Sequence, residues 1–187
     1  MPHDALTDEA LMLAVQGGDV DRLSSLFERY HRQLFAFFYQ MLRDRSAAED
    51  LVQDVFVRVL KYRRTFQPET SFKAWIFHIA RNSRHDFVRK HPPAGGTVDD
   101  AMASFDAGVG AQLEKDDETA LLRRALSRLS ANKRELIILA RYRGMSYEEL
   151  AALMEVDQGT VRVRLHRAIR QLGDVFHELR GTTRHAL

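Results

Sequence analysis

One stretch near the C-terminal end of the chain, residues 146–172, predicts two short helices joined by a tight turn. Ser146 and Glu149 have the spacing of a capping box at the start of the first helix. Asp157 can cap the second helix, because apolar residues follow it at helical spacing, namely Val161, Leu165, Ala168, Ile169 and Leu172. Two helices in this order form a helix-turn-helix, whose second helix enters the major groove of DNA.

The outward side of this second helix is basic. The helix carries no acidic residue between Gln158 and Gln171. Side chains near the start of such a helix read bases, while flanking cations bind phosphates. A solvated basic face is the simpler alternative, but the capped helix that precedes it favours DNA binding. The candidate DNA contacts are Thr160, Arg162, Val163, Arg164, His166, Arg167 and Arg170.

Composition and the N-terminal segment exclude several other functions. The chain has no cysteine, which excludes disulfides, thiolate catalysis and cysteine-bound zinc and fits a reducing cytoplasm. Residues 1–19 contain acids where a signal peptide needs cations. No apolar run approaches the roughly 20 residues of a membrane span. We therefore expect a soluble, cytoplasmic protein without membrane insertion.

Charged residues divide the chain into three parts. Lys and Arg outnumber Asp and Glu by 14 to 12 in residues 1–91 and by 13 to 8 in residues 118–187, whereas residues 92–117 hold 1 basic against 6 acidic residues. Two prolines and several glycines in the middle part argue against a packed element. The sequence therefore predicts an all-α fold, in which two small helical domains, 1–91 and 118–187, are joined by an acidic flexible linker, 92–117. The linker's charge can keep it off DNA phosphates or mimic nucleic acid in a basic channel, and a solvated tether is an equal alternative.

Apolar periodicity in residues 1–91 predicts four helices. Thr7 can cap a first short helix, and the long second helix has an apolar stripe that includes Phe27. Ser46 and Glu49 form a further capping box at the start of the third helix. One side of this third helix is apolar, and the opposite side exposes Asp50, Gln53, Asp54 and Arg58.

A turn around Pro68 separates the third helix from the fourth, because proline cannot continue a helix. Thr70 or Ser71 can cap the fourth helix. Aromatic side chains alternate with cations on this helix and on the loop before it, a pattern that suits single-stranded nucleic acid, where bases stack on rings and cations follow phosphates. The alternative is an ordinary apolar core with solvated arginines.

Two sets of motifs occur in a fixed order along the chain. The first set comprises AAEDLVQDVF, which begins at Ala47, then FKAWI at Phe72 and IARN at Ile79. The second set covers residues 129–172 and includes GTVR, which begins at Gly159. The first set resembles region 2, and the second region 4, of the extracytoplasmic-function sigma factors of bacterial RNA polymerase. That family commonly has serine at the position of Val163 and a glycine-acid pair at Pro68-Glu69, so the base specificity is expected to differ.

The resemblance assigns roles to these residues. It implies that Asp50, Gln53 and Asp54 dock on core RNA polymerase. It also implies that the loop 67–71 and the fourth helix hold the melted minus-10 strand of promoter DNA. The minus-10 contacts would be Gln67, Glu69, Thr70, Ser71, Phe72, Lys73, Trp75, Arg81, Asn82 and Arg84. The basic helix, with the DNA contacts named above, would read the minus-35 element. An anti-sigma factor is a further expected partner.

Enzymatic motifs are absent from the sequence. It contains no P-loop, no G-x-G-x-x-G and no G-x-S-x-G. His78 and His85 are seven residues apart, but no third ligand has the spacing of a metal site. We therefore expect no catalytic residue, metal or cofactor. Besides a sigma factor, a helix-turn-helix regulator that binds duplex DNA without polymerase and an adaptor without a DNA role remain as alternatives.

Overall fold

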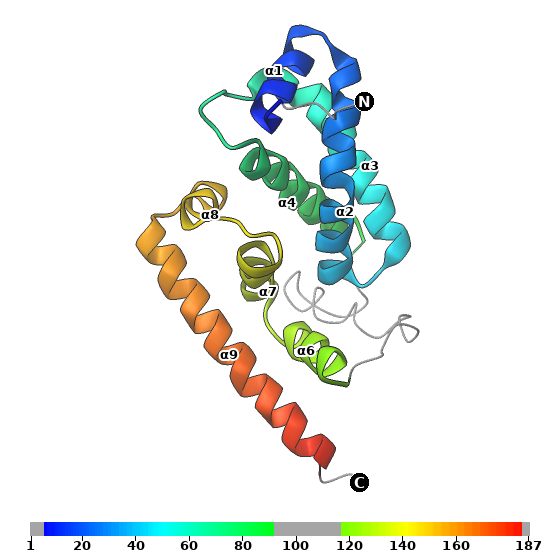
Figure 1. Cartoon of the computed structure of the whole chain (residues 1–187). Coiled ribbons are helices and arrows are strands. Elements are labelled where there is room, and N and C mark those ends of the chain that lie inside the picture. Colours follow the sequence, from blue (N-terminus) through cyan, green and yellow to red (C-terminus); the bar gives the residue numbers. More distant parts are fainter. Residues whose placement is uncertain (1–5, 92–116, 185–187) are drawn as a thin grey trace. The chain divides into compact units, whose positions relative to one another are not determined.

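Helices account for all the regular structure of the computed structural model, which describes residues 6–91 and 117–184 (Figure 1). The N-terminal part contains α1 (Asp8–Gly17), η1 (Val20–Arg22), α2 (Leu23–Leu42), α3 (Arg45–Tyr62), η2 (Arg63–Thr65) and α4 (Phe72–Lys90). The C-terminal part contains α6 (Asp117–Ser127), α7 (Ala131–Ile137), η4 (Ile138–Tyr142), α8 (Tyr147–Met154) and α9 (Gln158–Arg184). The predicted all-α fold is confirmed.

The chain divides into two compact units. The first holds residues up to Tyr39 together with Arg45–Phe87, and the second holds Gln40–Asp44 and the residues from Val88 on. Of the predicted acidic linker, residues 92–116 lie outside the described residues, and Asp117 already begins α6. The predicted domain boundaries therefore stay a prediction.

The core of the first unit is aromatic and aliphatic. Fully buried residues line one side of α2 at intervals of three and four, namely Leu26, Tyr30, Leu34, Phe37 and Phe38. The ring of Phe37 meets that of Phe77 on α4 edge to face at 5.6 Å. Burying each large apolar side chain contributes about 1.5–3 kcal/mol, so this side of α2 contributes substantially to the stability of the unit. Phe27 was predicted in this stripe but is 42% exposed, because it packs at the rim, stacked on His31 at 4.9 Å and tilted against Phe56.

Helix starts and ends in the first unit follow local chemistry in part. Thr7 caps α1 as predicted, since its Oγ1 accepts the N–H of Ala10 at 3.2 Å. Gly18 ends α1 at φ 111°, in the left-handed region that favours glycine. The capping box predicted at Ser46 is wrong. Helix α3 already begins at Arg45, and Glu49 forms an ion pair with Arg45 at 2.9 Å, one turn away.

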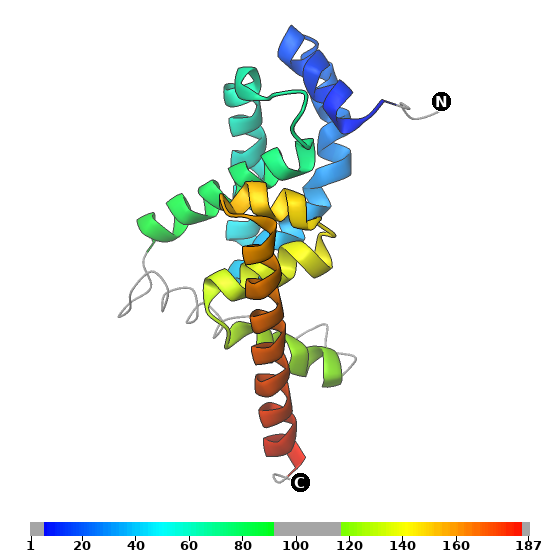
Figure 2. The ribbon, with the colours of Figure 1, turned by 90° about the vertical axis from the view of Figure 1, so that its left-hand side faces the viewer.

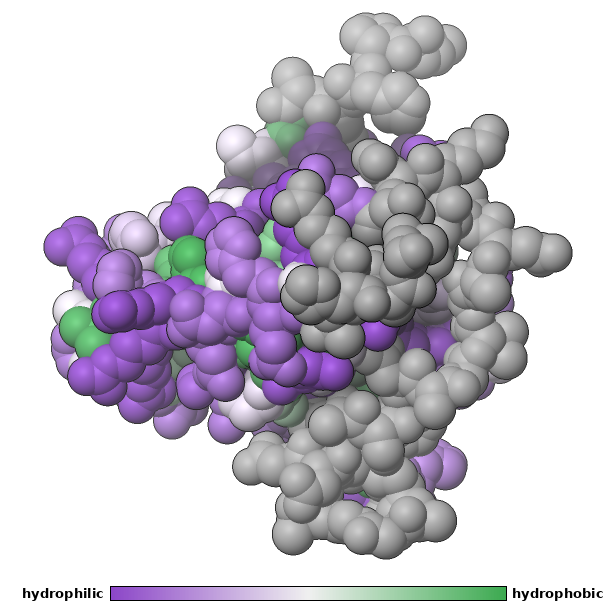
Figure 3. All heavy atoms as spheres, turned by 90° about the horizontal axis from the view of Figure 1, so that it is seen from below, coloured by the Kyte–Doolittle hydropathy of each residue, from purple (hydrophilic) through white to green (hydrophobic). Residues whose placement is uncertain are grey.

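The second unit is organised around α9, an uninterrupted helix of 27 residues that packs on α6, α7 and α8 (Figures 1 and 2). Val161, Leu165 and Ala168 are buried, as the sequence predicted, and Leu179 is buried as well. Ile169 and Leu172 are only half-buried. The surface seen from below is mostly hydrophilic, with scattered hydrophobic patches (Figure 3).

A wider helical turn follows α7. In η4, the N–H of Arg143 donates to the carbonyl of Ile138 at 3.0 Å, so the hydrogen bond spans five residues instead of four. Gly144 then leaves the helix at φ 60°. Ile138 and Leu139 are fully buried within this turn, so the wider turn adjusts which residues of the segment face the core.

Candidate nucleic-acid and polymerase interfaces

Helices α8 and α9 form the predicted helix-turn-helix. The capping box at Ser146 is complete, because its Oγ accepts the N–H of Glu149 at 3.1 Å while the Glu149 carboxylate accepts the N–H of Ser146 at 2.8 Å. Glu155 ends α8 in the left-handed region, at φ 54°. The N–H of Val156 then bonds back to the carbonyl of Ala151 at 3.1 Å. The turn between the two helices is therefore fixed by backbone and side-chain hydrogen bonds.

Asp157 caps α9 with both carboxylate oxygens. Its Oδ1 accepts the N–H of Thr160 at 2.8 Å, and its Oδ2 accepts the Thr160 hydroxyl at 2.6 Å. These two hydrogen bonds from Thr160 hold the pKa of Asp157 below its ordinary value, although the carboxylate is exposed. The Thr160 hydroxyl, which was predicted as a DNA contact, thus already donates a hydrogen bond within the cap.

The pH dependence of this cap is a first prediction. Because the folded-state pKa of Asp157 is lowered, its stabilisation is present above the ordinary aspartate pKa of 3.8 and is lost as pH falls through the folded-state pKa. Asp157→Asn keeps a capping oxygen but cannot titrate. As the pH falls, the backbone amides in the first turns of α9 should therefore lose protection against hydrogen exchange, relative to the other helices, in the wild type. In the variant their relative protection should not change. If the difference in amide protection between the wild type and the variant is the same at every pH, the titrating role of the Asp157 cap is wrong.

The exposed side of α9 carries one continuous stripe. His166 and Arg167 lie three and four residues after Val163, and Arg170 lies three and four residues after Arg167 and His166, so the four share one face, and all four are exposed. Within the described residues, Arg167 and Arg170 form no hydrogen bond or ion pair, which leaves their guanidinium groups available for base edges or phosphates. We call these four residues the α9 stripe.

Two predicted cations lie beside the α9 stripe. The guanidinium of Arg162 lies over the ring of Tyr147 on α8, 5.3 Å from its centroid. Arg164 is exposed on the other flank of the helix. Sequence reasoning missed Tyr147, although an exposed aromatic residue next to the Ser146 cap was a visible signal. The contact joins the two helices at the surface that would meet DNA.

The predicted docking face lies on α3. Asp50 and Gln53 are exposed, and Asp54 is partly exposed on the same side one turn along. Val57 extends the stripe and is 63% exposed, and sequence reasoning assigned it no role. We call Asp50, Gln53, Asp54 and Val57 the α3 stripe. Single exposed apolar residues are common on protein surfaces, so the exposed polar groups of Asp50 and Gln53 remain the main basis of the docking prediction.

An ion-pair network ties one member of the α3 stripe to α4. Arg58 bridges Asp54 of α3 at 2.8 Å and Asp86 of α4 at 2.9 Å. Burial lowers the pKa of Arg58, but its hydrogen bonds and charge interactions with Asp86 and Asp54 outweigh burial, so its pKa is raised. Asp54 therefore also has a structural role, whereas Asp50 and Gln53 have none that the described residues reveal.

The loop between η2 and α4 presents several predicted minus-10 contacts. Gln67 and Glu69 are exposed, and a hydrogen bond from the N–H of Thr70 to the carbonyl of Gln67 at 3.0 Å closes a turn around Pro68. Ser71 caps α4, since its Oγ accepts the N–H of Ala74 at 3.3 Å. We call residues 67–71 the minus-10 loop.

Helix α4 separates the remaining predicted contacts. Trp75, His78 and Asn82 are spaced by three and four residues and share one face, on which Trp75 is half-buried and Asn82 exposed. By the same spacing Lys73 and Arg84 lie toward the opposite side, and Arg81 lies between. The helix thus brings Trp75 and Asn82 together and adds His78, which sequence reasoning considered only as a metal ligand.

Two predicted minus-10 contacts are fully buried. Phe72 is 0% exposed and packs edge-on against Tyr30 at 5.2 Å and Phe66 at 6.0 Å. Arg84 is likewise 0% exposed. Neither side chain therefore belongs to the exposed surface of α4. Phe72 fills the aromatic core at the start of the helix. Their contact with DNA stays a prediction that requires both to become accessible.

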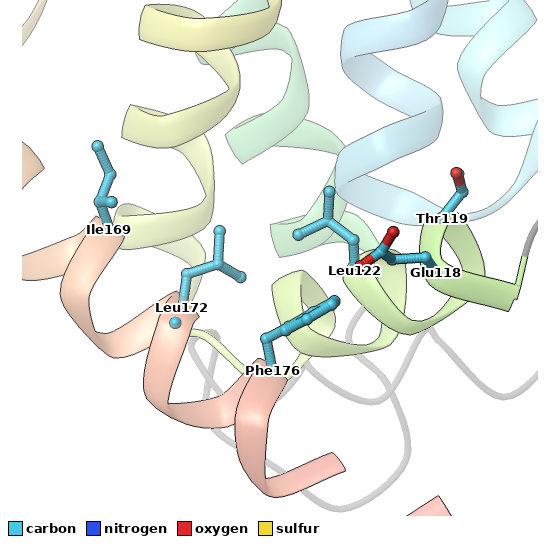
Figure 4. A pocket seen from close by; sticks show the side chains of 7 residues that line it. Glu118, Thr119, Leu122, Ile169, Leu172 and Phe176 are labelled. Atoms are coloured by element: carbon cyan, nitrogen blue, oxygen red, sulfur yellow. The ribbon is translucent and has the colours of Figure 1, made fainter. Parts of the chain in front are cut away.

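A groove in the second unit lies between α6 and α9 and measures about 490 Å³ (Figure 4). In Figure 4, Leu122 of α6 faces Phe176 of α9 across this space. The lining is mainly apolar and consists of Glu118, Thr119, Leu122, Ile169, Leu172, Gly173 and Phe176. The half-buried state of Ile169 and Leu172 follows from this groove.

Other kinds of site receive no support from residues 6–91 and 117–184. Within these ranges, no group of three or more His, Asp or Glu side chains is placed to hold a metal ion. In the same described part, no helix combines the length and the apolar character needed to cross a membrane.

Comparison with known proteins decides the family. The family model Sigma-70 region 2 matches residues 26–92, and Sigma-70, region 4 matches residues 119–172. RNA polymerase sigma factor CarQ of Myxococcus xanthus is 32% identical over 166 residues, which cover 87% of this chain and 93% of CarQ. ECF RNA polymerase sigma factor SigX of Bacillus subtilis is 30% identical over 157 residues, 79% of each chain. The chain is an extracytoplasmic-function sigma factor. As such, this sigma factor directs transcription initiation by RNA polymerase.

Solved structures agree with the fold of this sigma factor. The sigma factor RpoE of Bartonella quintana, in complex with the anti-sigma factor NepR, has a TM-score of 0.64 at 29% identity and covers 83% of this chain and 96% of its own. CnrH, in complex with the cytosolic domain of CnrY, has a TM-score of 0.72 at 24% identity and supports the fold alone. The α9 stripe and the minus-10 loop thus lie in the regions that the two sigma family models match.

Proposed function

We propose that this sigma factor divides its work between the two units. The α3 stripe docks on core RNA polymerase, the minus-10 loop with Trp75 and Asn82 holds the melted minus-10 strand, and the α9 stripe reads the minus-35 duplex. The proposed domains are residues 1–91 and 118–187, with residues 92–117 as the linker. The chain itself supplies no catalytic residue, because the polymerase performs the chemistry.

The observation that carries this proposal is the α9 stripe. Four exposed residues at one helical face, two of them arginines without a partner in the described part, follow a turn that capping fixes on both sides. A recognition helix needs this combination of a rigid start and available donors, because bidentate contacts to guanine require a fixed approach. The capped turn supplies the rigidity, and Arg167 supplies the donors.

The proposed partners follow from the surfaces. Core RNA polymerase fits the acidic α3 stripe with its exposed Val57, and promoter DNA fits the cations of α9. An anti-sigma factor is a further proposed partner, because the similar sigma factor RpoE was solved in complex with the anti-sigma factor NepR. The apolar groove between α6 and α9 could accept an apolar side chain of such a polypeptide. Because its partners are polymerase and chromosomal DNA, we propose that the protein acts in the cytoplasm.

Run-off transcription tests the proposal. Core polymerase alone and polymerase with the chain are incubated with a promoter pool whose minus-35 and minus-10 elements are randomised. Each template carries a downstream barcode that identifies its promoter. The expected result is enrichment, only when the chain is present, of transcripts whose barcodes come from templates that share both elements. DNA binding without polymerase-dependent transcripts would instead indicate a duplex-binding regulator, and the absence of both would indicate an adaptor.

A further inference from the structure

Helix α1 precedes the region 2 match, which begins at residue 26, and is tied to α2. The Asp8 carboxylate accepts a guanidinium hydrogen bond from Arg29 at 2.6 Å and the hydroxyl of Tyr30 at 2.5 Å. Leu11, Met12 and Val15 of α1 are fully buried. The helix is therefore a fixed part of the first unit, anchored at its start by a charged side chain.

The C-terminal end of α1 holds the segment before the minus-10 loop. The Gln16 side-chain amide donates two hydrogen bonds, to the carbonyls of Arg63 and Phe66, both at 3.1 Å. Its two amide hydrogens thus bind the beginning of η2 and the residue that follows it. Phe66 is the last residue before the minus-10 loop, so Gln16 fixes the backbone where the loop starts.

The N-terminal end of α1 holds the segment after the loop. The Glu9 carboxylate accepts the N–H of Phe72, the first residue of α4, at 3.0 Å. The first N–H groups of a helix lack partners within the helix, and an anion there also interacts favourably with the helix dipole. Glu9 thus adds a charged cap from a separate element to the local cap by Ser71.

The minus-10 loop is consequently held at both ends by the same helix. We propose that Glu9 and Gln16 are positioning residues that set the conformation of the minus-10 loop and thereby the selectivity for the melted minus-10 strand. This inference rests on the proposed function of the loop. We assign Gln16 and Glu9 a positioning role, because Nε2 of Gln16 and one carboxylate oxygen of Glu9 bind the backbone on either side of the loop.

The test uses holoenzyme assembled with the full-length chain. Its probe is a single-stranded oligonucleotide selected from a random pool by wild-type holoenzyme, compared with a scrambled strand. Gln16→Glu replaces two donors by a carboxylate facing carbonyls, and Glu9→Ala removes the cap, so each should lower the selected-to-scrambled affinity ratio at least about fivefold. Glu9→Gln still presents an oxygen to Phe72 and should restore the ratio to within about twofold. Leu13→Ala, an exposed change on the same helix, is the matched control.

The outcomes separate positioning from stability. A purely structural role would lower the melting temperature, polymerase affinity and binding of both strands together and leave the ratio unchanged. A wild-type ratio in a folded Gln16→Glu variant would overturn the inference while leaving the loop's proposed function intact. If wild-type holoenzyme enriches no strand from the pool, the loop's proposed function fails, and this inference fails with it.

Discussion

Core RNA polymerase is expected to bind the Asp50→Arg variant at least about tenfold more weakly than the wild type, a loss of about 1.4 kcal/mol or more. Asp50 is exposed at the start of the α3 stripe and has no intramolecular partner among the described residues. Reversing its charge should therefore weaken docking without affecting the fold. The measurement is a binding titration of labelled chain with core polymerase, alongside the melting temperature of the free chain.

Asp54→Arg serves as an internal comparison for this prediction. It places a second cation next to Arg58 and breaks the link from α3 through Arg58 to Asp86, so it should lower both polymerase affinity and melting temperature. Glu28→Arg, an equal change of charge at an exposed position of α2, controls for net charge. Unchanged polymerase affinity in a folded Asp50→Arg variant would remove the α3 stripe from the docking surface.

Arg167→Ala should lower the preference for the cognate minus-35 duplex by about 1–3 kcal/mol, the value of one bidentate base contact. Arg167 lies in the first half of α9 on the α9 stripe, where side chains reach base edges. Arg170 lies nearly one turn further on and is expected to bind phosphate. Arg170→Ala should therefore weaken cognate and scrambled duplexes alike and flatten the salt dependence, because one fewer counterion is released.

The two arginine variants are compared in holoenzyme across a salt series on both duplexes. Arg164→Ala, on the flank of the helix, is a matched loss of charge. If all three substitutions weaken cognate and scrambled duplexes by the same factor, α9 is an electrostatic clamp, and the assignment of Arg167 to base reading is wrong.

Local signals in the sequence predicted the helix-turn-helix well. The capping residues Ser146 and Asp157 act on groups within three residues, so their spacing in the sequence is nearly their spacing in space. The apolar period of α9 predicted its buried side for the same reason. At Ser46 the local signal failed because Glu49 forms an ion pair with Arg45 instead of a capping box with Ser46. The sequence spacing permits either interaction, so it could not decide between them.

Features that depend on tertiary contacts were beyond the sequence patterns. Phe72 and Arg84 are an aromatic and a basic residue, the types that bind single-stranded nucleic acid, yet both are fully buried. The face that a helix buries depends on neighbours from elsewhere in the chain, which the residue types alone do not reveal. Likewise, the bridge from Asp54 through Arg58 to Asp86 joins two helices, and no period in either helix predicts it. Base contacts and docking contacts depend on partners and therefore stay predictions.

The attachment of α1 also bears on how the chain folds during synthesis. Gln16 and Glu9 bind backbone groups 47 to 63 residues further along, so these two contacts form only after η2 and the start of α4 have been synthesised. At about 5–20 residues per second, this interval of 47 to 63 residues lasts roughly 2 to 13 s. A ten-residue helix is marginal alone in water, so α1 should first form against α2, through Asp8 with Arg29 and Tyr30. The contacts that hold the minus-10 loop at both ends are then completed only when residue 72 arrives, and in shorter nascent chains Glu9 has no backbone partner beyond the loop.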